Sequence, residues 1–193
     1  MPFIDLIFQK LELVCLENTT DYRLERMLDM QVYHYPFDDE VRASLDRYFN
    51  KLCDGNKPEI DEINIKGRNL KILAYSGVAR KNFIEVCGQP LGAADFLTLA
   101  ERYHTIILDE IPRMDEGMES EARRFVTFIA ALYEAKVNLI CSAEVSPQEL
   151  YIKGEGVFEF ERLVSRLMEM QSVDYLGLPH GKSDQKKDDS STD

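Results

Sequence analysis

The chain has 193 residues, of which 45% are apolar and 30% charged, and these values are typical of a soluble globular domain with a sizeable core. Its 35 acidic and 23 basic residues give a net charge of −12, which argues against a broad nucleic-acid surface, because such a surface needs clustered Lys and Arg. No apolar run approaches the roughly 20 residues that cross a bilayer.

The first residues, M-P-F-I-D-L-I-F, lack a basic segment and carry Asp5 within the apolar run, so we do not expect a signal peptide. Four cysteines occur without a C-x-x-C or other metal-binding spacing. Cys15 and Cys141 lie in apolar runs and are expected to be buried. The predicted compartment is the reducing cytoplasm.

The N-terminal segment is amphipathic, with Ile4, Ile7 and Phe8 on one helical face, and residues 13–16 have the composition of a strand. A chain that opens inside an amphipathic element suggests a fragment, a split gene or an isolated domain. These alternatives stay open at the level of sequence.

Four elements are predicted in the first half of the chain. Residues 38–52 form a helix that Asp38 caps, and residues 63–72 form a β-hairpin around Gly67. Residues 78–87 are a strand candidate of mixed polarity, and residues 93–102 form a helix.

The central stretch predicts a parallel βαβ unit. Residues 105–108 form a buried strand, residues 119–135 an amphipathic helix, and residues 137–141 a second buried strand. Beyond this unit, Ser146 can cap a short turn, and residues 158–171 form another amphipathic helix.

Two acids, Asp109 and Glu110, follow the first strand of this unit. In P-loop NTPases an acid at the end of a buried parallel strand holds Mg²⁺, so these are weak candidates for a Walker-B-like pair. The alternative is that they open a turn and are solvated.

The only G-K-S run, Gly181–Lys182–Ser183, does not fit a phosphate loop, G-x-x-x-x-G-K-[ST]. Three residues instead of four separate it from Gly177, and no strand precedes it. We therefore do not expect this chain to hold ATP tightly by itself.

Three arginines are candidates for contacts with a nucleotide. Arg123 and Arg124 open the central helix, where cations are disfavoured, so one of them could reach a nucleotide in a neighbouring subunit. Pairing with Glu119, Glu121 or nearby acids is the alternative. Arg166 lies one turn after Arg162 and could serve an anion, an acidic partner or only a solvated face. No catalytic triad and no metal site can be argued from His34 or His104.

Three long segments carry a resemblance to a known family. They are C-G-Q-P-L-G-A-A-D-F-L-T-L-A-E-R-Y-H-T, E-S-E-A-R-R-F-V-T-F-I-A-A-L-Y-E-A-K-V-N-L-I-C-S-A-E and F-E-F-E-R-L-V-S-R-L-M-E-M-Q-S. They resemble the C-terminal half of the ZapE family of P-loop ATPases, which are linked to bacterial cell division and have mitochondrial relatives. P-F-I-D-L-I and T-D-Y-R-L-E-R resemble that family's middle segment, so the resemblance extends over residues 2–176.

The resemblance implies ATP and Mg²⁺ use by a full-length AAA+ protein, a homo-oligomer and division-ring or membrane-associated partners. It also implies that Walker A and the principal Walker B acids lie upstream of this chain. Arg123, Arg124 and Arg166 match family motifs, whereas a catalytic role does not carry over to Asp109 and Glu110.

We therefore predict an α/β, P-loop NTPase-like C-terminal part with a parallel βαβ unit, an antiparallel hairpin and flanking helices. Residues 1–52 are predicted to continue an absent ATPase core, 53–176 to form an α/β domain and 177–193 to be a disordered tail. The predicted function is that of the C-terminal part of a ZapE-type ATPase, inactive alone. The alternative is a non-catalytic module that docks on a division or membrane-associated partner.

Overall fold

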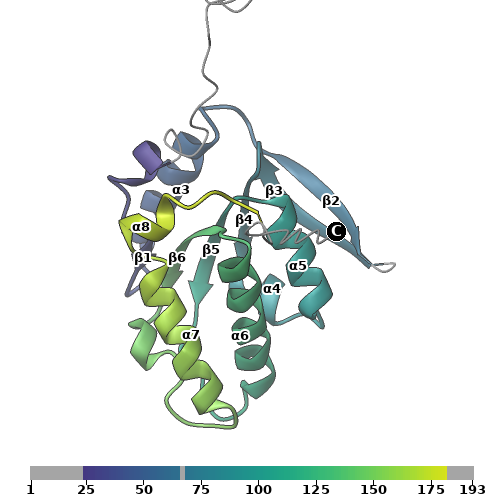
Figure 1. Cartoon of the computed structure of the whole chain (residues 1–193), viewed down its shortest axis with the longest axis vertical. Helices are drawn as coiled ribbons and strands as arrows, with labels where there is room; N and C mark the ends of the chain where they lie inside the picture. The colour runs from purple at the N-terminus through teal and green to yellow at the C-terminus, as the bar shows by residue number, and fades with distance from the viewer. Residues whose placement is uncertain (1–23, 66–67, 182–193) are drawn as a thin grey trace, which may run out of the picture.

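The fold is built on one six-stranded sheet, seen in Figure 1, in the order β1-β6-β5-β4-β3-β2. The computed structural model describes residues 24–65 and 68–181. The strands are β1 (Tyr33–His34), β2 (Glu59–Ile65), β3 (Arg68–Tyr75), β4 (Val78–Asn82), β5 (Thr105–Ile111) and β6 (Asn138–Ala143). The helices are α3 (Asp39–Leu52), α4 (Phe83–Cys87), α5 (Ala93–Arg102), α6 (Glu119–Glu134), α7 (Val157–Glu169) and α8 (Val173–Leu176), with a 3₁₀ turn, η1 (Pro147–Glu149).

The sheet is mixed. Strands β1, β6, β5 and β4 run parallel, and β3 and β2 extend the sheet as an antiparallel hairpin beside β4. The unit β5-α6-β6 is the predicted parallel βαβ unit. The predicted α/β class, with its antiparallel hairpin and flanking helices, is therefore confirmed, and the turn at residues 66–67 lies outside the described residues.

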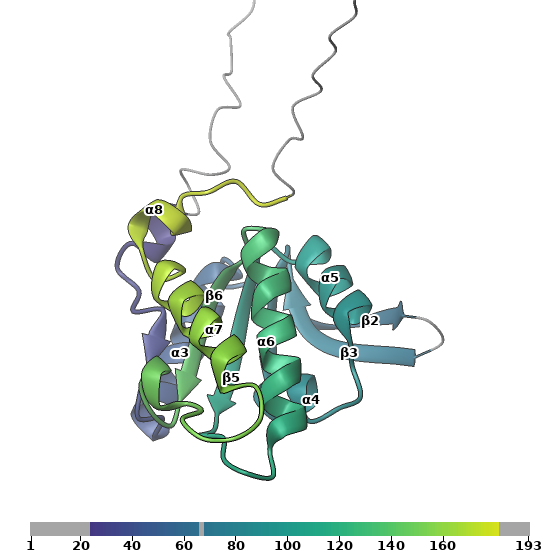
Figure 2. The same ribbon diagram turned by 60° about the horizontal axis from the view of Figure 1, so that its bottom comes forward.

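Helices cover both faces of the sheet, as Figure 2 shows: α4, α5, α6 and α7 lie on one face and α3 on the other. Alternate residues of the buried strands feed the two resulting cores. In β5, Ile106 and Leu108 belong to the core under α5, α6 and α7, whereas Ile107 belongs to the core under α3. This period of two is what a strand buried on both faces requires.

Two local signals explain where α3 and α4 begin. Asp38 caps α3 as predicted, because its carboxylate accepts from the amide of Val41 at 2.8 Å. The prediction of one strand over residues 78–87 was wrong beyond Asn82. There a capping box, in which Asn82 and Glu85 exchange side-chain and backbone hydrogen bonds, ends the strand and starts α4.

The segment after α8 runs back over two other helices. The imidazole Nε2 of His180 lies 2.7 Å from the carbonyl oxygen of Ala100, in the last turn of α5. The amide of Gly181 donates to the carbonyl of Ala135, at the end of α6, at 3.0 Å. These residues thus satisfy acceptors that helix ends leave open.

Several predictions lie outside the described residues. They include the amphipathic segment near 4–11, the strand at 13–16, Lys182 of the G-K-S run and residues 182–193 of the predicted tail 177–193. The predicted division at residue 52 stays a prediction, although β1 and α3 join the same sheet and core as the later elements. Across the described ranges, no helix has the length and apolarity to cross a membrane.

Candidate functional site

The two predicted acids lie inside β5 and not after it. The strand was predicted to end at Leu108, but it continues through Ile111. Between the register pairs Leu108–Cys141 and Ile111–Ala143, β5 carries two residues where β6 carries only Ser142. The extra residue makes a β-bulge, and such bulges re-aim side chains at the ends of strands.

Glu110 adopts the left-handed backbone conformation at this bulge, with φ of +59°. The bulge removes its amide from the regular ladder, and the hydroxyl of Ser142 accepts from that amide at 2.9 Å. A non-glycine residue in this region is unusual and is often found where side-chain placement matters.

Asp109 is held by Arg80 of the neighbouring strand β4. The guanidinium donates to both carboxylate oxygens, at 2.7 and 3.1 Å, and a third nitrogen donates to Asp46 of α3 at 2.6 Å. Burial lowers the pKa of Arg80, but the hydrogen bonds and charges of Asp109 and Asp46 outweigh that effect and leave the pKa raised. Arg80 is therefore a permanent cation that ties α3, β4 and β5 together.

Glu110 has its own set of partners. Arg42 of α3 forms an ion pair with one carboxylate oxygen, and the amide nitrogen of Asn82 donates to the other at 2.7 Å. The hydrogen bond that Arg42 donates to Glu110 is the first cause that raises the pKa of Arg42. Both predicted acids are thus paired with cations of the same chain.

A cavity of about 460 Å³ opens beside these ion pairs. It carries as many cationic as anionic side chains, and it is lined by Arg42, Asp46, Ile60, Lys71, Leu73, Arg80, Lys81, Asn82, Glu85, Asp109 and Glu110. In the part of the chain that the structure describes, no three His, Cys, Asp or Glu side chains cluster to hold a metal ion. A magnesium ion at Asp109 would first have to displace Arg80.

Arg123 and Arg124 are neighbours in α6 but differ in how firmly they are held. Arg123 pairs with Glu155 at 3.2 Å, and the side chains are 72% and 78% exposed. Arg124 is only 23% exposed, pairs with Glu121 at 3.1 Å and donates to the carbonyl of Cys87. Arg124 therefore has a structural tie that Arg123 lacks.

Arg166 lies on α7, where it packs over the ring of Tyr133 at 5.3 Å and pairs with Glu134 at 3.6 Å. The three arginines belong to the helical layer opposite α3, whereas Asp109 pairs with Arg80, which also pairs with Asp46 of α3. The structure therefore does not bring the predicted acids and the predicted arginines into one site.

Sequence reasoning did not find Arg80, Arg42, Asn82 or Ser142. One signal was present: the charged residue Arg80 directly follows two apolar residues of β4, Val78 and Ala79, which are buried. A charge at such a position needs a partner, and the acids of the next strand are the nearest ones.

His34 is buried on the α3 face, and its ring lies 5.7 Å from that of Tyr48. Burial lowers its pKa, and its Nε2 atom has no hydrogen-bond partner among the described residues. The neighbouring rings of Tyr33 and Tyr35 lie 5.9 Å apart.

The mixed sheet with helices on both faces defines an α/β protein. The family model of the AFG1-like ATPases matches residues 1–179. The chain therefore belongs to the AFG1-like ATPase family, as the resemblance to ZapE-type proteins predicted.

Curated relatives come from bacteria and eukaryotes. The cell division protein ZapE of Escherichia coli K12 is 35% identical over 184 residues, which cover 93% of this chain and 48% of the relative. An uncharacterized protein of Schizosaccharomyces pombe is 34% identical, covering 93% and 46% of the two chains. The Danio rerio protein named lactation elevated protein 1 homolog B is 27% identical, covering 91% and 42%.

The chain thus spans about half the length of the curated relatives that it matches. No solved structure matches it.

Proposed function

We propose that this chain works as the C-terminal part of an AFG1-like ATPase in which the phosphate loop lies in the other half. Family membership, the half-length match to ZapE and the missing G-x-x-x-x-G-K-[ST] motif support this proposal. Hydrolysis of MgATP, and a role in cell division like that named for the E. coli relative, are properties of the full-length protein. The chain alone is inactive.

Within that ATPase, Arg123 is the residue proposed to act on a nucleotide bound by a neighbouring subunit. The observation that supports this role is the 72% exposure of the Arg123 side chain, whose partner is the equally exposed carboxylate of Glu155. Arginines that stabilise phosphoryl transfer in trans need this freedom to reach across an interface. Arg124 and Arg166 are held by contacts of their own chain, so they organise the helical layer.

Asp109 and Glu110 are proposed to be structural. Their ion pairs with Arg80 and Arg42 already supply the cations that a carboxylate at a strand end requires. Magnesium in the full-length protein is therefore expected at acids of the other half.

The test is ATP turnover by the full-length protein that carries Arg123→Ala. Loss of a charge that acts in trans is expected to lower kcat by about 100-fold or more while nucleotide binding persists. Arg162→Ala is the matched control, because Arg162 is an exposed arginine of α7 that packs over Phe158. Mixing Arg123→Ala chains with chains that lack a working phosphate loop should restore part of the activity. Unchanged turnover in Arg123→Ala would remove the proposed role.

A second function is a non-catalytic module that docks on a partner. The net charge of −12 and the exposed apolar side chains Phe158 and Ile152 favour it. A full-length protein that keeps its turnover when Arg123 is replaced, but loses partner binding when Phe158 is replaced by Ala, would favour this second function.

A further inference from the structure

The exposed aromatic side chains among the described residues lie at one end of the sheet. Tyr35 and Phe37 follow β1 and are 52% and 36% exposed, and Phe158, in the first turn of α7 after β6, is 67% exposed. Because β1, β5 and β6 are parallel, the segments that follow them leave the sheet at the same end, its carboxyl end. Figure 1 shows α6 and α7 beginning at this end and running back along the sheet.

Hydrogen bonds join the segments after β1, β5 and β6 to one another. The amide of Phe37 donates to the carbonyl of Ala143 at 2.9 Å, which ties the segment after β1 to the end of β6. The amide of Arg113 donates to the carboxylate of Glu144 at 2.9 Å, which ties the segment after β5 to the segment after β6. The surface that these segments form is therefore largely preformed, so little conformational entropy is lost when a partner binds to it.

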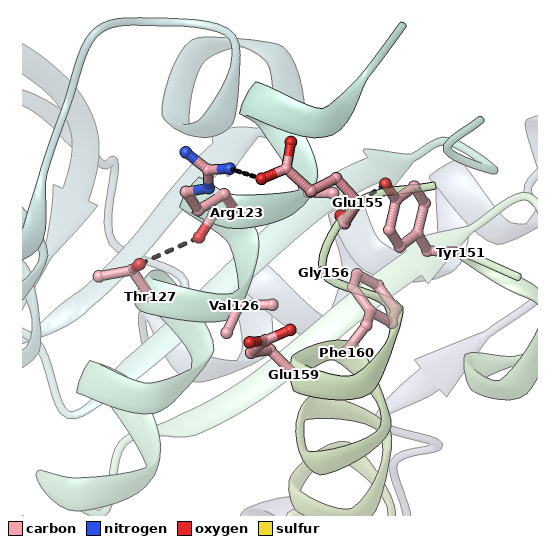
Figure 3. A pocket seen from close by; sticks show the side chains of 9 residues that line it. Arg123, Val126, Thr127, Tyr151, Glu155, Gly156, Glu159 and Phe160 are labelled. Atoms are coloured by element: carbon pink, nitrogen blue, oxygen red, sulfur yellow. Dashed lines mark hydrogen bonds and ion pairs between the residues drawn. The ribbon is translucent and has the colours of Figure 1, made fainter. Parts of the chain in front are cut away.

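Two exposed arginines lie at the same end of the sheet. Arg113 follows β5, and its guanidinium forms no hydrogen bond or ion pair within residues 24–65 and 68–181. Arg123 of α6 pairs with Glu155 in the loop before α7, as Figure 3 shows, and both of these side chains are largely exposed. Arginine and aromatic residues are enriched in protein–protein interfaces, so the composition of this end favours a protein partner.

Ile152 adds an aliphatic side chain to this end of the molecule. It is 58% exposed and precedes Lys153, which pairs with Glu116 of the segment after β5 at 2.8 Å. We name the exposed side chains at this end the carboxyl-end surface. Its members are Tyr35, Phe37, Arg113, Arg123, Ile152 and Phe158.

We propose that the carboxyl-end surface packs against the phosphate-loop half of a neighbouring copy of the full-length ATPase. This inference rests on the first function proposed above, because Arg123, which is proposed to reach a nucleotide in another subunit, belongs to this surface. The curated relatives are about twice as long as this chain, so the part of such a protein that this chain does not match is large enough to supply the facing surface. Arg113, which has no acid of its own, is available for an anion of the facing half.

An exposed isoleucine elsewhere in the fold lacks this setting. Ile60 is 59% exposed, but it lies on β2, at the opposite edge of the sheet from β1. On the neighbouring strand β3, Lys71 already pairs with Glu62 of β2 at 3.0 Å. Ile60 therefore matches Ile152 in side chain and exposure but lies away from the carboxyl-end surface.

The experiment is sedimentation velocity of the full-length protein with MgATP over a range of protein concentrations. Phe158→Ala and Ile152→Asp are each expected to weaken self-association about tenfold or more, because they remove an apolar anchor or bury a charge. Ile60→Asp is the matched control, with the same substitution at the same exposure, and should associate as the wild type does. Circular dichroism verifies that all three variants stay folded.

Hydrogen exchange distinguishes a neighbouring copy from the phosphate-loop half of the same copy. The amides of residues 152–158 are expected to exchange more slowly as the protein concentration rises, whereas those of β2 should not change. Protection of residues 152–158 that does not depend on concentration would assign the surface to a contact within one copy and overturn the proposal.

Two further results would overturn the proposal. One is a wild-type protein that sediments as a monomer with MgATP at every concentration. The other is equal self-association of Ile152→Asp and Ile60→Asp. Turnover of Arg123→Ala tests the proposed function, whereas self-association of the Ile152 and Phe158 variants tests this surface, so the two failures are distinguishable.

Discussion

Arg80 of β4 joins two other elements of the fold, β5 and α3. Its guanidinium is 15% exposed and joins Asp109, which is 18% exposed, to Asp46 on α3. Removing one partner of a largely buried pair costs more than the pair contributes, because the other charge is left without compensation. The main effect of this ion pair on stability is therefore the free energy that is lost when one of its partners is removed.

Arg80→Ala is expected to lower the free energy of unfolding by about 2–4 kcal/mol, because Asp109 keeps its charge without a cation. Urea denaturation followed by circular dichroism measures this. Lys71→Ala is the control, since the pair between Lys71 and Glu62 is 66% and 54% exposed and should change stability by less than about 1 kcal/mol. Equal losses in the two variants would contradict the argument.

Glu110 allows the cost of its backbone conformation to be measured separately from its side-chain contacts. At φ of +59°, Glu110→Gly should be more stable than Glu110→Ala by about 1 kcal/mol, because only glycine adopts this region without a steric penalty. Both variants lose the contacts with Arg42 and Asn82. The difference between their free energies of unfolding therefore reports the cost of the backbone conformation alone. The opposite order, which is usual inside strands, would show that the bulge relaxes on substitution.

At the scale of elements, the β2–β3 hairpin is tied to α5 through Asp61. Its carboxylate accepts two hydrogen bonds from Arg102, both at 2.7 Å, and one from the hydroxyl of Tyr103 at 2.7 Å. The hydrogen bond with Arg102 is the first cause that lowers the pKa of Asp61. The hairpin therefore carries an acid-sensitive connection to the helical layer.

The sign of this pH dependence follows from proton binding. Because the pKa of Asp61 is lower in the folded state than the roughly 3.9 of an unfolded chain, the unfolded state binds more protons between the two values. The stabilisation is present above pH ~4 and is lost as the pH falls through the folded pKa. Asp61→Asn should cost about 1 kcal/mol at pH 7 and show a shallower loss of stability below pH ~4. Parallel acid-unfolding curves for wild type and variant would contradict this.

Helices and strands with a clear hydrophobic period were predictable from the sequence. An end was predictable where one capping residue determines it, as Asp38 does for the start of α3. The end of β5 was not predictable, because the bulge depends on Ser142, a residue of a strand that is remote in sequence. The switch from β4 to α4 could have been found from Asn82 and Glu85, whose spacing is that of a capping box.

For the whole molecule, the sequence predicted the α/β class and the family correctly. It associated the two acids with the right strand, although they lie inside β5 and not after it. What it could not predict were the cations that neutralise those acids. Arg42 belongs to α3 and Arg80 to β4, so both meet the acids of β5 only through the packing of these elements in the folded chain. Which cation pairs with which acid depends on the tertiary structure, and local sequence patterns do not determine it.

The purified 193-residue chain is expected to show neither micromolar affinity for MgATP nor steady hydrolysis, because it has no phosphate loop. Calorimetric titration with MgATP and a phosphate-release assay measure the two properties. A P-loop ATPase of known affinity, run in parallel, shows that the assays respond. Steady turnover by the chain alone would overturn its assignment as the part without the phosphate loop.

The contacts of His180 and Gly181 have a practical consequence. A stop codon or a protease cut before these residues would uncover the carbonyls of Ala100 and Ala135, and the last turns of α5 and α6 would fray. Amide hydrogens in those turns would then exchange faster than in the longer chain. A purification tag or a fused fluorophore should therefore be attached beyond residue 181.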